Sequence, residues 1–268
     1  MTAIPPLLLV GAGRMGAALL AGWRELGLTA SVAVDPAPGA AALAGADLTV
    51  VTDAHAIPVG FAPALVVFAV KPQAAAETLP HYARYSGRAG FLSIMAGRTL
   101  GGIRSLLGPD AAVIRAMPNT PAAIRQGITV ACPGPAVTEA QRALAETLLG
   151  AIGEVAFVAD EALLDPVTAV SGSGPAYVFL LAELLEQAAV AQGIPPDLAR
   201  RLARRTVAGS GALLGASAED AAALRVAVTS PAGTTEAALR ILMAADAWPA
   251  AMDRAIAAAT ARSRELAG

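Results

Sequence analysis

Short apolar segments alternate with amphipathic stretches along the first 160 residues. Eight segments are too short for helices and are mostly rich in β-branched residues, which predicts strands. They are LLLV (7–10), SVAVD (31–35), LTVV (48–51), ALVVFAV (64–70), GFLSIMAG (90–97), AAVIRAMP (111–118), GITVAC (127–132) and EVAFVAD (154–160). Strands that are apolar throughout are typical of a parallel sheet covered by helices on both faces. We therefore expect an α/β domain with a largely parallel sheet.

The pattern changes after residue 160. Residues 175–192, 196–214 and 234–266 show helical spacing and consist mainly of good helix formers. The chain is therefore expected to divide into an α/β domain over residues 1–160 and an all-α domain over residues 161–268.

Composition narrows the class of partner. The chain has 268 residues, of which 56% are hydrophobic, and a formal net charge of −2 without blocks of like charge. This balance argues against nucleic acid and anionic lipid and favours a small-molecule partner. The long uncharged runs contain Pro and Gly, so no membrane-spanning helix is expected. The first residues lack the basic stretch of a secretion signal, so we expect a cytoplasmic protein.

A glycine triplet follows the first strand. Gly11, Gly13 and Gly16 have G-x-G-x-x-G spacing between a strand and a helix. This arrangement is typical of a Rossmann-type dinucleotide-binding domain, in which the glycines allow a tight turn, close approach of a pyrophosphate and close helix packing. The alternative is a purely structural turn in another α/β protein.

Asp35 ends the second strand, nineteen residues after Gly16, where a ribose-binding carboxylate is expected. A carboxylate there accepts a hydrogen bond from a ribose hydroxyl and repels a 2′-phosphate, which favours NADH. Arg14, inside the glycine motif, is positioned to reach an added phosphate, so NADPH stays open. A solvated turn acid is the alternative for Asp35.

Few other side chains offer reactive chemistry. Lys71, the only lysine, lies in AVKPQ (69–73) at the carboxyl edge of the fourth strand, where ligands of open α/β sheets bind. A solvated strand end is its alternative role. Cys132 is expected to be buried in a strand. His55 and His81 show no partner pattern, so we expect surface or capping roles and no metal site.

Two segments of the helical half are rich in Ser, Thr and Gly. SGSGPAY (171–177) has Pro175 in the first turn of a predicted helix and Ser173 as a candidate cap, which would leave backbone N–H groups for an anion. TSPAGTTEA (229–237) repeats this design, with a helix beginning near Thr234. Both segments are neutral anion-binding candidates, and a capped helix that binds nothing is the alternative.

The chain has no His or Lys after His81. Alcohol-oxidising dehydrogenases usually need a positioned base of one of these types. Reduction of an electrophilic C=N bond tolerates their absence, because solvent or a weak donor supplies the proton and the enzyme works mainly by positioning.

On these residues the chain resembles the pyrroline-5-carboxylate reductases, essentially from end to end. The segments GAGRMG, AVKPQ, MPNTPA (117–122), SGSGPAYVFLLAE and VTSPAGTTEAAL occur in the family's order. The resemblance implies a Rossmann domain, a helical domain that interleaves with that of a second subunit, NADPH or NADH as cofactor, and reduction of 1-pyrroline-5-carboxylate to L-proline. It also implies a homodimer that in many members assembles further, as far as a decamer.

The resemblance also implies roles for individual residues. Thr235 would lie near the ring nitrogen, and the substrate would be held by Ser230, Gly233, Thr234, Thr235, Ser173 and Gly174. The cofactor would be bordered by Gly11, Gly13, Arg14, Met15, Gly16, Asp35, Ala69, Val70, Lys71, Pro72, Ala96 and Asn119.

Two positions depart from the family pattern. Ala232 stands where Gly is usual, and Ala227 stands where a polar residue, often Asn, is usual. Two alternatives are a β-hydroxyacid dehydrogenase, which would need a lysine in the helical half, and a non-catalytic dinucleotide-binding interaction protein.

Overall fold

The computed structural model describes residues 4–267, so residues 1–3 of the N-terminal prediction lie outside the described part of the chain. All eight predicted strands are confirmed, and they form one sheet in the order β3-β2-β1-β4-β5-β6-β7-β8. Their bounds are β1 Leu7–Val10, β2 Ser31–Val34, β3 Leu48–Val51, β4 Leu65–Phe68, β5 Gly90–Ser93, β6 Ala112–Met117, β7 Gly127–Pro133 and β8 Gly153–Phe157.

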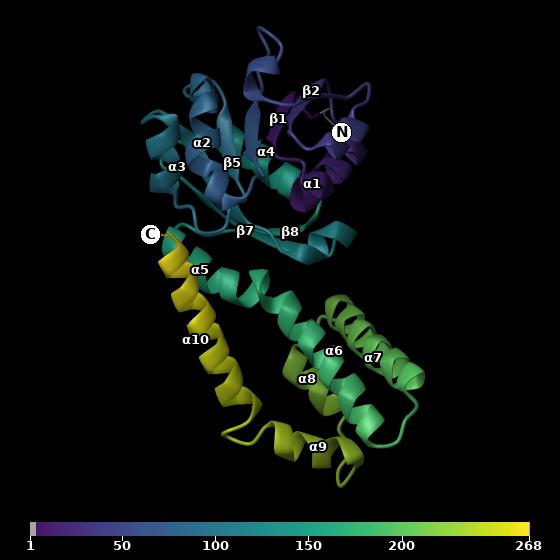
Figure 1. Cartoon of the computed structure of the whole chain (residues 1–268). Helices are drawn as coiled ribbons and strands as arrows, with labels where there is room; N and C mark the ends of the chain where they lie inside the picture. Colours follow the sequence, from purple (N-terminus) through teal and green to yellow (C-terminus); the bar gives the residue numbers. More distant parts are fainter. Residues whose placement is uncertain (1–3, 268) are drawn as a thin grey trace. The chain divides into compact units, whose positions relative to one another are not determined.

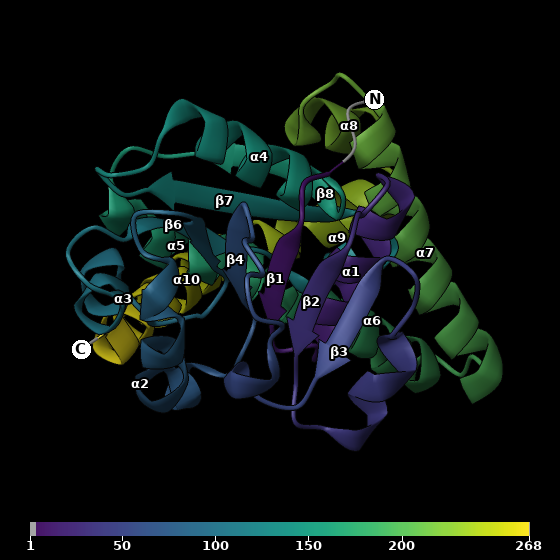
Figure 2. The ribbon, with the colours of Figure 1, turned by 90° about the horizontal axis from the view of Figure 1, so that it is seen from above.

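The sheet is parallel except between β6 and β7. Leu8 of β1 lies opposite Val32 of β2 on one side and Val66 of β4 on the other, and Figure 2 shows these strands side by side. The strand order therefore reverses direction between β1 and β4. In open parallel sheets, ligands bind outside the carboxyl ends of the strands at such a reversal.

Helices cover both faces of the sheet because alternate strand residues point to opposite sides. Leu7 and Leu9 pack with α1 (Arg14–Glu25) and α4 (Glu139–Gly150). Leu8 and Val10 belong to the cluster on the other face, with residues of α2 (Ala75–Thr78), α3 (Leu100–Leu107) and the 3-10 segment η4 (Leu79–Tyr85). Figure 1 shows α2 and α3 apart from α1.

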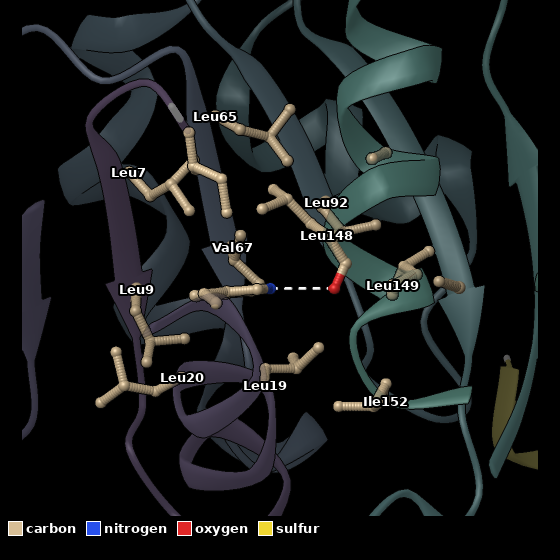
Figure 3. Close-up of a cluster of buried hydrophobic side chains, with 14 of the residues drawn as sticks. Leu7, Leu9, Leu19, Leu20, Leu65, Val67, Leu92, Leu148, Leu149 and Ile152 are labelled. Atoms are coloured by element: carbon tan, nitrogen blue, oxygen red, sulfur yellow. Dashed lines mark hydrogen bonds between the residues drawn. The ribbon is translucent and has the colours of Figure 1, made fainter. Parts of the chain in front are cut away.

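The first cluster joins α1 to α4 by a polar contact as well as by packing. Figure 3 shows Leu7, Leu9, Leu19 and Leu148 in this cluster, where the indole Nε1 of Trp23 donates to the carbonyl oxygen of Leu148 at 2.9 Å. That carbonyl belongs to the last turn of α4, where carbonyl groups lack intrahelical partners. The buried indole therefore satisfies a helix end.

The second half is helical, as the sequence predicts. Residues 161–191 form an almost unbroken helical stretch made of η6 (Glu161–Leu163), α5 (Leu164–Val167), a π-helical turn (Thr168–Gly172) and α6 (Gly174–Ala191). Further helices are α7 (Pro196–Ala216), α8 (Ala221–Ala227), α9 (Thr234–Leu242) and α10 (Trp248–Ala267). The expected helix over 234–266 is interrupted at residues 243–247, and Pro249 falls in the first turn of α10 (Trp248–Ala267). A proline fits there, whereas inside one continuous helix its missing N–H and its ring would disrupt the preceding turn.

By length and composition, Glu161–Ala191 is able to cross a membrane, with a mean hydropathy of 1.3 over its most apolar window and 6% of that window buried. From the sequence, Pro and Gly are predicted to interrupt this run. The interruption does not occur, because Pro175 falls in the first turn of α6, where a proline fits a helix.

The chain contains two compact units. The described residues 4–172 and 259–267 make up the first, and residues 173–258 make up the second. This division lies twelve residues beyond the predicted boundary at 160/161, which stays a prediction. The last turns of α10 belong to the first unit, where the Ser263 hydroxyl donates to the Asp165 carboxylate at 2.7 Å.

The second unit has almost no core of its own. Among residues 173–258, only Ala199 and Ala203 are buried. Its exposed large apolar side chains include Phe179, Leu180, Leu184, Leu198, Leu202, Leu213, Leu214, Val226, Ile241, Trp248 and Met252. An apolar surface of this extent marks an interface with another protein surface.

Candidate functional site

A cavity of about 700 Å³ lies at the carboxyl ends of the strands, at the reversal between β1 and β4. It collects residues from β1, β2 and β4 and from the segments that follow β2, β3 and β4. Its described lining is Val10, Gly11, Gly13, Val34, Asp35, Pro36, Ala37, Thr52, Asp53, Ala54, His55, Ala69, Val70, Lys71, Ala74, Glu77, Thr78, His81 and Tyr82.

The three glycines have different surroundings. Gly11 has φ +93°, and a Cβ there would lie 2.8 Å from the carbonyl carbon of Ala69. A Cβ on Gly16 would lie 2.2 Å from the Gly11 carbonyl oxygen, whereas a Cβ on Gly13 would meet nothing within 4 Å. Gly11 and Gly16 therefore make the turn and the close packing, and Gly13 faces open space. This is the arrangement that a dinucleotide pyrophosphate requires.

The first turn of α1 presents free backbone donors to this space. Its N-cap residue, Gly13, has no side chain to accept from them, and the turn contains no acidic residue. In α3, by contrast, the Thr99 hydroxyl accepts from the backbone N–H of Gly102, and Thr138 forms a capping box in α4. The N-terminus of α1 is therefore suited to an anionic group.

Asp35, in the lining of the cavity, is held by two backbone donors. The N–H of Ala12 donates to Oδ2 at 2.6 Å, and the N–H of Ala37 donates to Oδ1 at 2.8 Å. A carboxylate offers about four acceptor positions, so both oxygens keep capacity for a ribose hydroxyl. The side chain is half-buried and fixed rather than a freely solvated turn acid.

The cavity is lined by both charged and neutral titratable side chains. The N–H groups of His55 and Ala56 donate to Asp53 and hold the pKa of that carboxyl below its usual range. Burial raises the pKa of the Tyr82 phenol, so it stays neutral. Among the described lining residues, Lys71 is the only Lys or Arg, and it is exposed as the N-cap of η3 (Pro72–Ala74).

Some of the expected cofactor residues lie outside this lining. Arg14 and Ala96 are exposed, and Met15 packs against the core cluster beneath α1. The amide of Asn119 is committed to backbone groups, since Nδ2 donates to the Ser171 carbonyl at 3.1 Å and Oδ1 accepts from the N–H of Ile128 at 3.0 Å. Asn119 therefore braces the π-helical turn.

Sequence reading missed a contact that fixes the loop after β4. Nε of Arg98 donates to the carbonyl oxygen of Pro72 at 3.0 Å, which joins the loop after β5 to the loop carrying Lys71. The only signal in the sequence was an arginine shortly after a predicted strand. Cys132 is buried in β7 and burial raises the pKa of its thiol, which confirms the expected structural role.

The second candidate site lies in residues 229–235, before and at the start of α9. Thr234 begins the helix, as the sequence predicts, and the N-cap residue Gly233 again has no side chain to accept from the first turn. The N–H of Gly233 is used within the loop, where it donates to the Ser230 carbonyl at 3.0 Å. The first-turn N–H groups, beginning with those of Thr234 and Thr235, are left for a ligand.

Two neighbours shape this loop. Ala232 has φ +57°, a left-handed conformation that costs a non-glycine residue about 1 kcal/mol or more. Its N–H donates at 2.6 Å to the carboxylate of Glu236, in the first turn of α9. Glu236 thus stabilises the strained turn, while its negative charge opposes a second carboxylate. The sequence signal for this contact was an acid four residues after the loop alanine.

The predicted cap of α6 is wrong. Ser173 makes no side-chain cap hydrogen bond and adopts a right-handed helical conformation. The reason is that a π-helical turn, Thr168–Gly172, leads into α6 with only Ser173 between them, so the chain does not arrive in the extended conformation that a capping serine needs. Substrate binding by Ser173 and Gly174 stays a prediction.

Comparison with known families identifies both halves of the chain. Residues 161–266 match the model described as pyrroline-5-carboxylate reductase dimerisation. Residues 7–97 match the model described as NADP oxidoreductase, coenzyme F420-dependent. The apolar stretch 161–191 thus falls within a dimerisation domain, which accounts for its exposed surface without a membrane.

Individual relatives and solved structures are similar to the chain over nearly its whole length. The pyrroline-5-carboxylate reductase of Pseudomonas aeruginosa is 39% identical over 267 residues, covering 98% of this chain and 97% of that protein. A pyrroline-5-carboxylate reductase structure from Coxiella burnetii has a TM-score of 0.91 at 28% identity and covers 99% of both chains. The Plasmodium falciparum pyrroline carboxylate reductase with NADP bound shares the fold, with a TM-score of 0.83 at 24% identity.

Substitution of Gly13 and of Gly16 distinguishes an effect on dinucleotide binding from an effect on the stability of the fold. Gly13→Ala is expected to keep the thermal unfolding midpoint of the free protein within about 1 °C, because its Cβ enters open space, yet to weaken dinucleotide binding at least about 10-fold. Gly16→Ala is expected to lower the midpoint by several degrees, because its Cβ overlaps the Gly11 carbonyl. Calorimetry measures both quantities, and equal effects of the two variants on stability would contradict the assignment.

Replacing Ala232 by glycine tests the strain in the loop before α9. Ala232→Gly is expected to stabilise the protein by about 1 kcal/mol, or roughly 2–4 °C in the unfolding midpoint. Ala238→Gly, at an exposed position inside α9, is the matched control and should destabilise by a similar amount. A loss of stability in both variants would show that the conformation of Ala232 carries no strain.

Proposed function

The chain belongs to the pyrroline-5-carboxylate reductase family, and on this premise we propose which of its residues carry out the reaction. The protein is an NAD(P)H-dependent oxidoreductase that reduces the C=N bond of 1-pyrroline-5-carboxylate to give L-proline in proline biosynthesis. The bound NAD(P)H supplies the hydride. What the chain's own residues supply is binding, orientation and a hydrogen bond.

The substrate carboxylate binds at the N-terminus of α9. The observation that carries this proposal is the pair of threonines that opens the helix directly after Gly233, an N-cap residue without a side chain. The N–H groups of Thr234 and Thr235 and the hydroxyl of Ser230 are the donors. Backbone donors at a helix start favour an anion without any charged side chain.

Residues 229–236 contain no Lys or Arg, and this lack of a cationic side chain matters for the reaction. A helix terminus attracts the carboxylate by less than a full positive charge, so the imine nitrogen keeps its tendency to be protonated before hydride arrives. Glu236, in the same turn, adds negative charge that stabilises a protonated ring nitrogen. The loop therefore holds the acid and favours the electrophilic iminium form.

Thr235 supplies the hydrogen bond to the ring nitrogen. Its side chain is half-buried, and its N–H lies in the same helical turn as the carboxylate donors. A hydroxyl is both donor and acceptor, so it orients the nitrogen whichever protonation state is present. The absence of His and Lys after residue 81 agrees with a reaction that works by positioning rather than by a strong base.

The cofactor lies in the cavity at the ends of β1, β2 and β4. Its pyrophosphate meets the N–H groups at Gly13 and the start of α1, and Asp35 accepts from the adenosine ribose. Ala69, Val70 and Lys71 border the nicotinamide half. The fixed carboxylate of Asp35 and the scarcity of lining cations favour NADH over NADPH.

Two further features complete the proposal. The apolar surface of the second unit is covered by a second copy of the chain, and such dimers assemble further, as far as a decamer. The enzyme works in the cytoplasm. A β-hydroxyacid dehydrogenase is disfavoured because the helical half contains no lysine, and a non-catalytic role is disfavoured by the retained substrate loop.

Thr235→Ala tests the role of the hydroxyl. With 1-pyrroline-5-carboxylate and NADH or NADPH, oxidation of the cofactor is expected to show kcat/KM lowered roughly 10- to 1000-fold, the range for losing one oriented donor. Thr235→Ser keeps the hydroxyl and should stay within about 10-fold of the original protein. Equal activity of the alanine variant and the original protein would remove Thr235 from the mechanism, and no turnover by the original protein would remove the function.

Asp35→Ala tests the cofactor preference. Loss of the carboxylate removes both a ribose acceptor and a charge that repels the 2′-phosphate, so the ratio of kcat/KM for NADPH to that for NADH should rise about 10-fold or more. Asp35→Asn, which removes the charge but keeps the shape, should change the ratio in the same direction. An unchanged ratio in both variants would mean that Asp35 does not face the ribose.

A further inference from the structure

The only two histidines of the chain meet on one wall of the cofactor cavity. His55 lies in η2 (Ala54–Ala56), directly after β3, and His81 lies in η4, after β4. Their ring centroids are 5.5 Å apart with an interplanar angle of 73°, and both rings line the cavity that contains Gly11, Gly13 and Asp35. Neither histidine has a role in the reaction described above.

The direction in which the dinucleotide runs along the cavity brings its base to this wall. The pyrophosphate lies at the start of α1 and the adenosine ribose lies at Asp35, so the base continues toward the end of β3. That end of the cavity is lined by Thr52, Asp53 and His55, and η4 contributes His81. The two imidazoles thus occupy the region left for a flat aromatic group.

We propose that His55 and His81, two imidazoles set edge to face on the wall of the dinucleotide cavity, bind the adenine ring of NAD(P)H. This inference rests on the cofactor placement proposed above and goes beyond it by assigning the base. Rings set edge to face form a corner that holds a planar ligand by stacking on one ring and by edge contact with the other. The imidazole nitrogens add donors and acceptors for the edge of the base.

The surrounding charges favour a neutral group here over the 2′-phosphate. Asp53 lies two residues before His55, Asp35 lines the same cavity, and Glu77 lies one turn before His81. Arg84 is turned to the Ala54 carbonyl oxygen, to which it donates at 3.0 Å, so Lys71 is the only Lys or Arg among the described residues that line the cavity. Three carboxylates beside two imidazoles suit an adenine ring better than an added phosphate.

Binding of ADP-ribose to the purified protein, measured by calorimetry, tests the proposal, because this probe carries the adenosine half without the nicotinamide. His55→Ala and His81→Ala are each expected to weaken ADP-ribose binding about 3- to 10-fold. Binding of reduced nicotinamide mononucleotide, which lacks adenosine, should be unchanged in both. His55→Phe and His81→Phe keep an aromatic face and should stay within about 2-fold of the original protein.

Controls separate the possible failures. Arg88→Ala changes a charge in the neighbouring cleft that His55 also lines, outside the dinucleotide cavity, and should leave ADP-ribose binding unchanged. Equal ADP-ribose affinity of the original protein and both alanine variants would overturn the adenine assignment while leaving the cofactor site intact. Absence of ADP-ribose binding to the original protein would instead overturn the cofactor placement itself. If an alanine variant does not fold, the corresponding phenylalanine variant is measured in its place. Weaker ADP-ribose binding by that phenylalanine variant would contradict the proposal.

Discussion

In the proposed cofactor and substrate sites, backbone N–H groups at helix starts, rather than Lys or Arg side chains, are the donors to the negative charge of the ligand. At α1 and at α9 the N-cap residue is glycine, so no side chain fills the place where a ligand's oxygen would accept. At α3, α4 and α8, side chains of Thr99, Thr138 and Asp220 take that place. A helix end without a cap is a cost to the free protein that a bound anion offsets. The cofactor and substrate assignments both depend on this constraint.

The surrounding structure fixes the positions of the N-termini of α1 and α9. The first is fixed by the sheet, since Gly11 and Gly16 are packed so closely against the strand ends that no side chain fits. The second is fixed by a strained turn, in which Ala232 adopts a left-handed conformation and Glu236 holds its N–H. The helical unit that carries this turn buries only Ala199 and Ala203, and the dimerisation family to which it belongs explains how so apolar a surface persists. The proposed substrate loop and the dimerisation domain therefore share the same unit.

Much of the fold was predictable because its signals are local. Each strand is a short apolar run, and the glycine spacing and the helix start at Thr234 are visible in the sequence alone. The misses have physical causes. The cap expected of Ser173 fails because a π-helical turn precedes it, and the membrane-length stretch 161–191 arises because Pro175 falls where a helix tolerates it. The meeting of His55 with His81 depends on packing between segments far apart in the chain, which no spacing in the sequence indicates.

The most direct test is a crystal structure of the protein with L-proline bound. The account predicts that the carboxylate of the ligand accepts from the N–H groups of Thr234 and Thr235 at about 3 Å, with the Thr235 hydroxyl near the ring nitrogen and no Arg or Lys side chain paired with the carboxylate. A carboxylate paired with an arginine, or a ligand bound away from the start of α9, would contradict it.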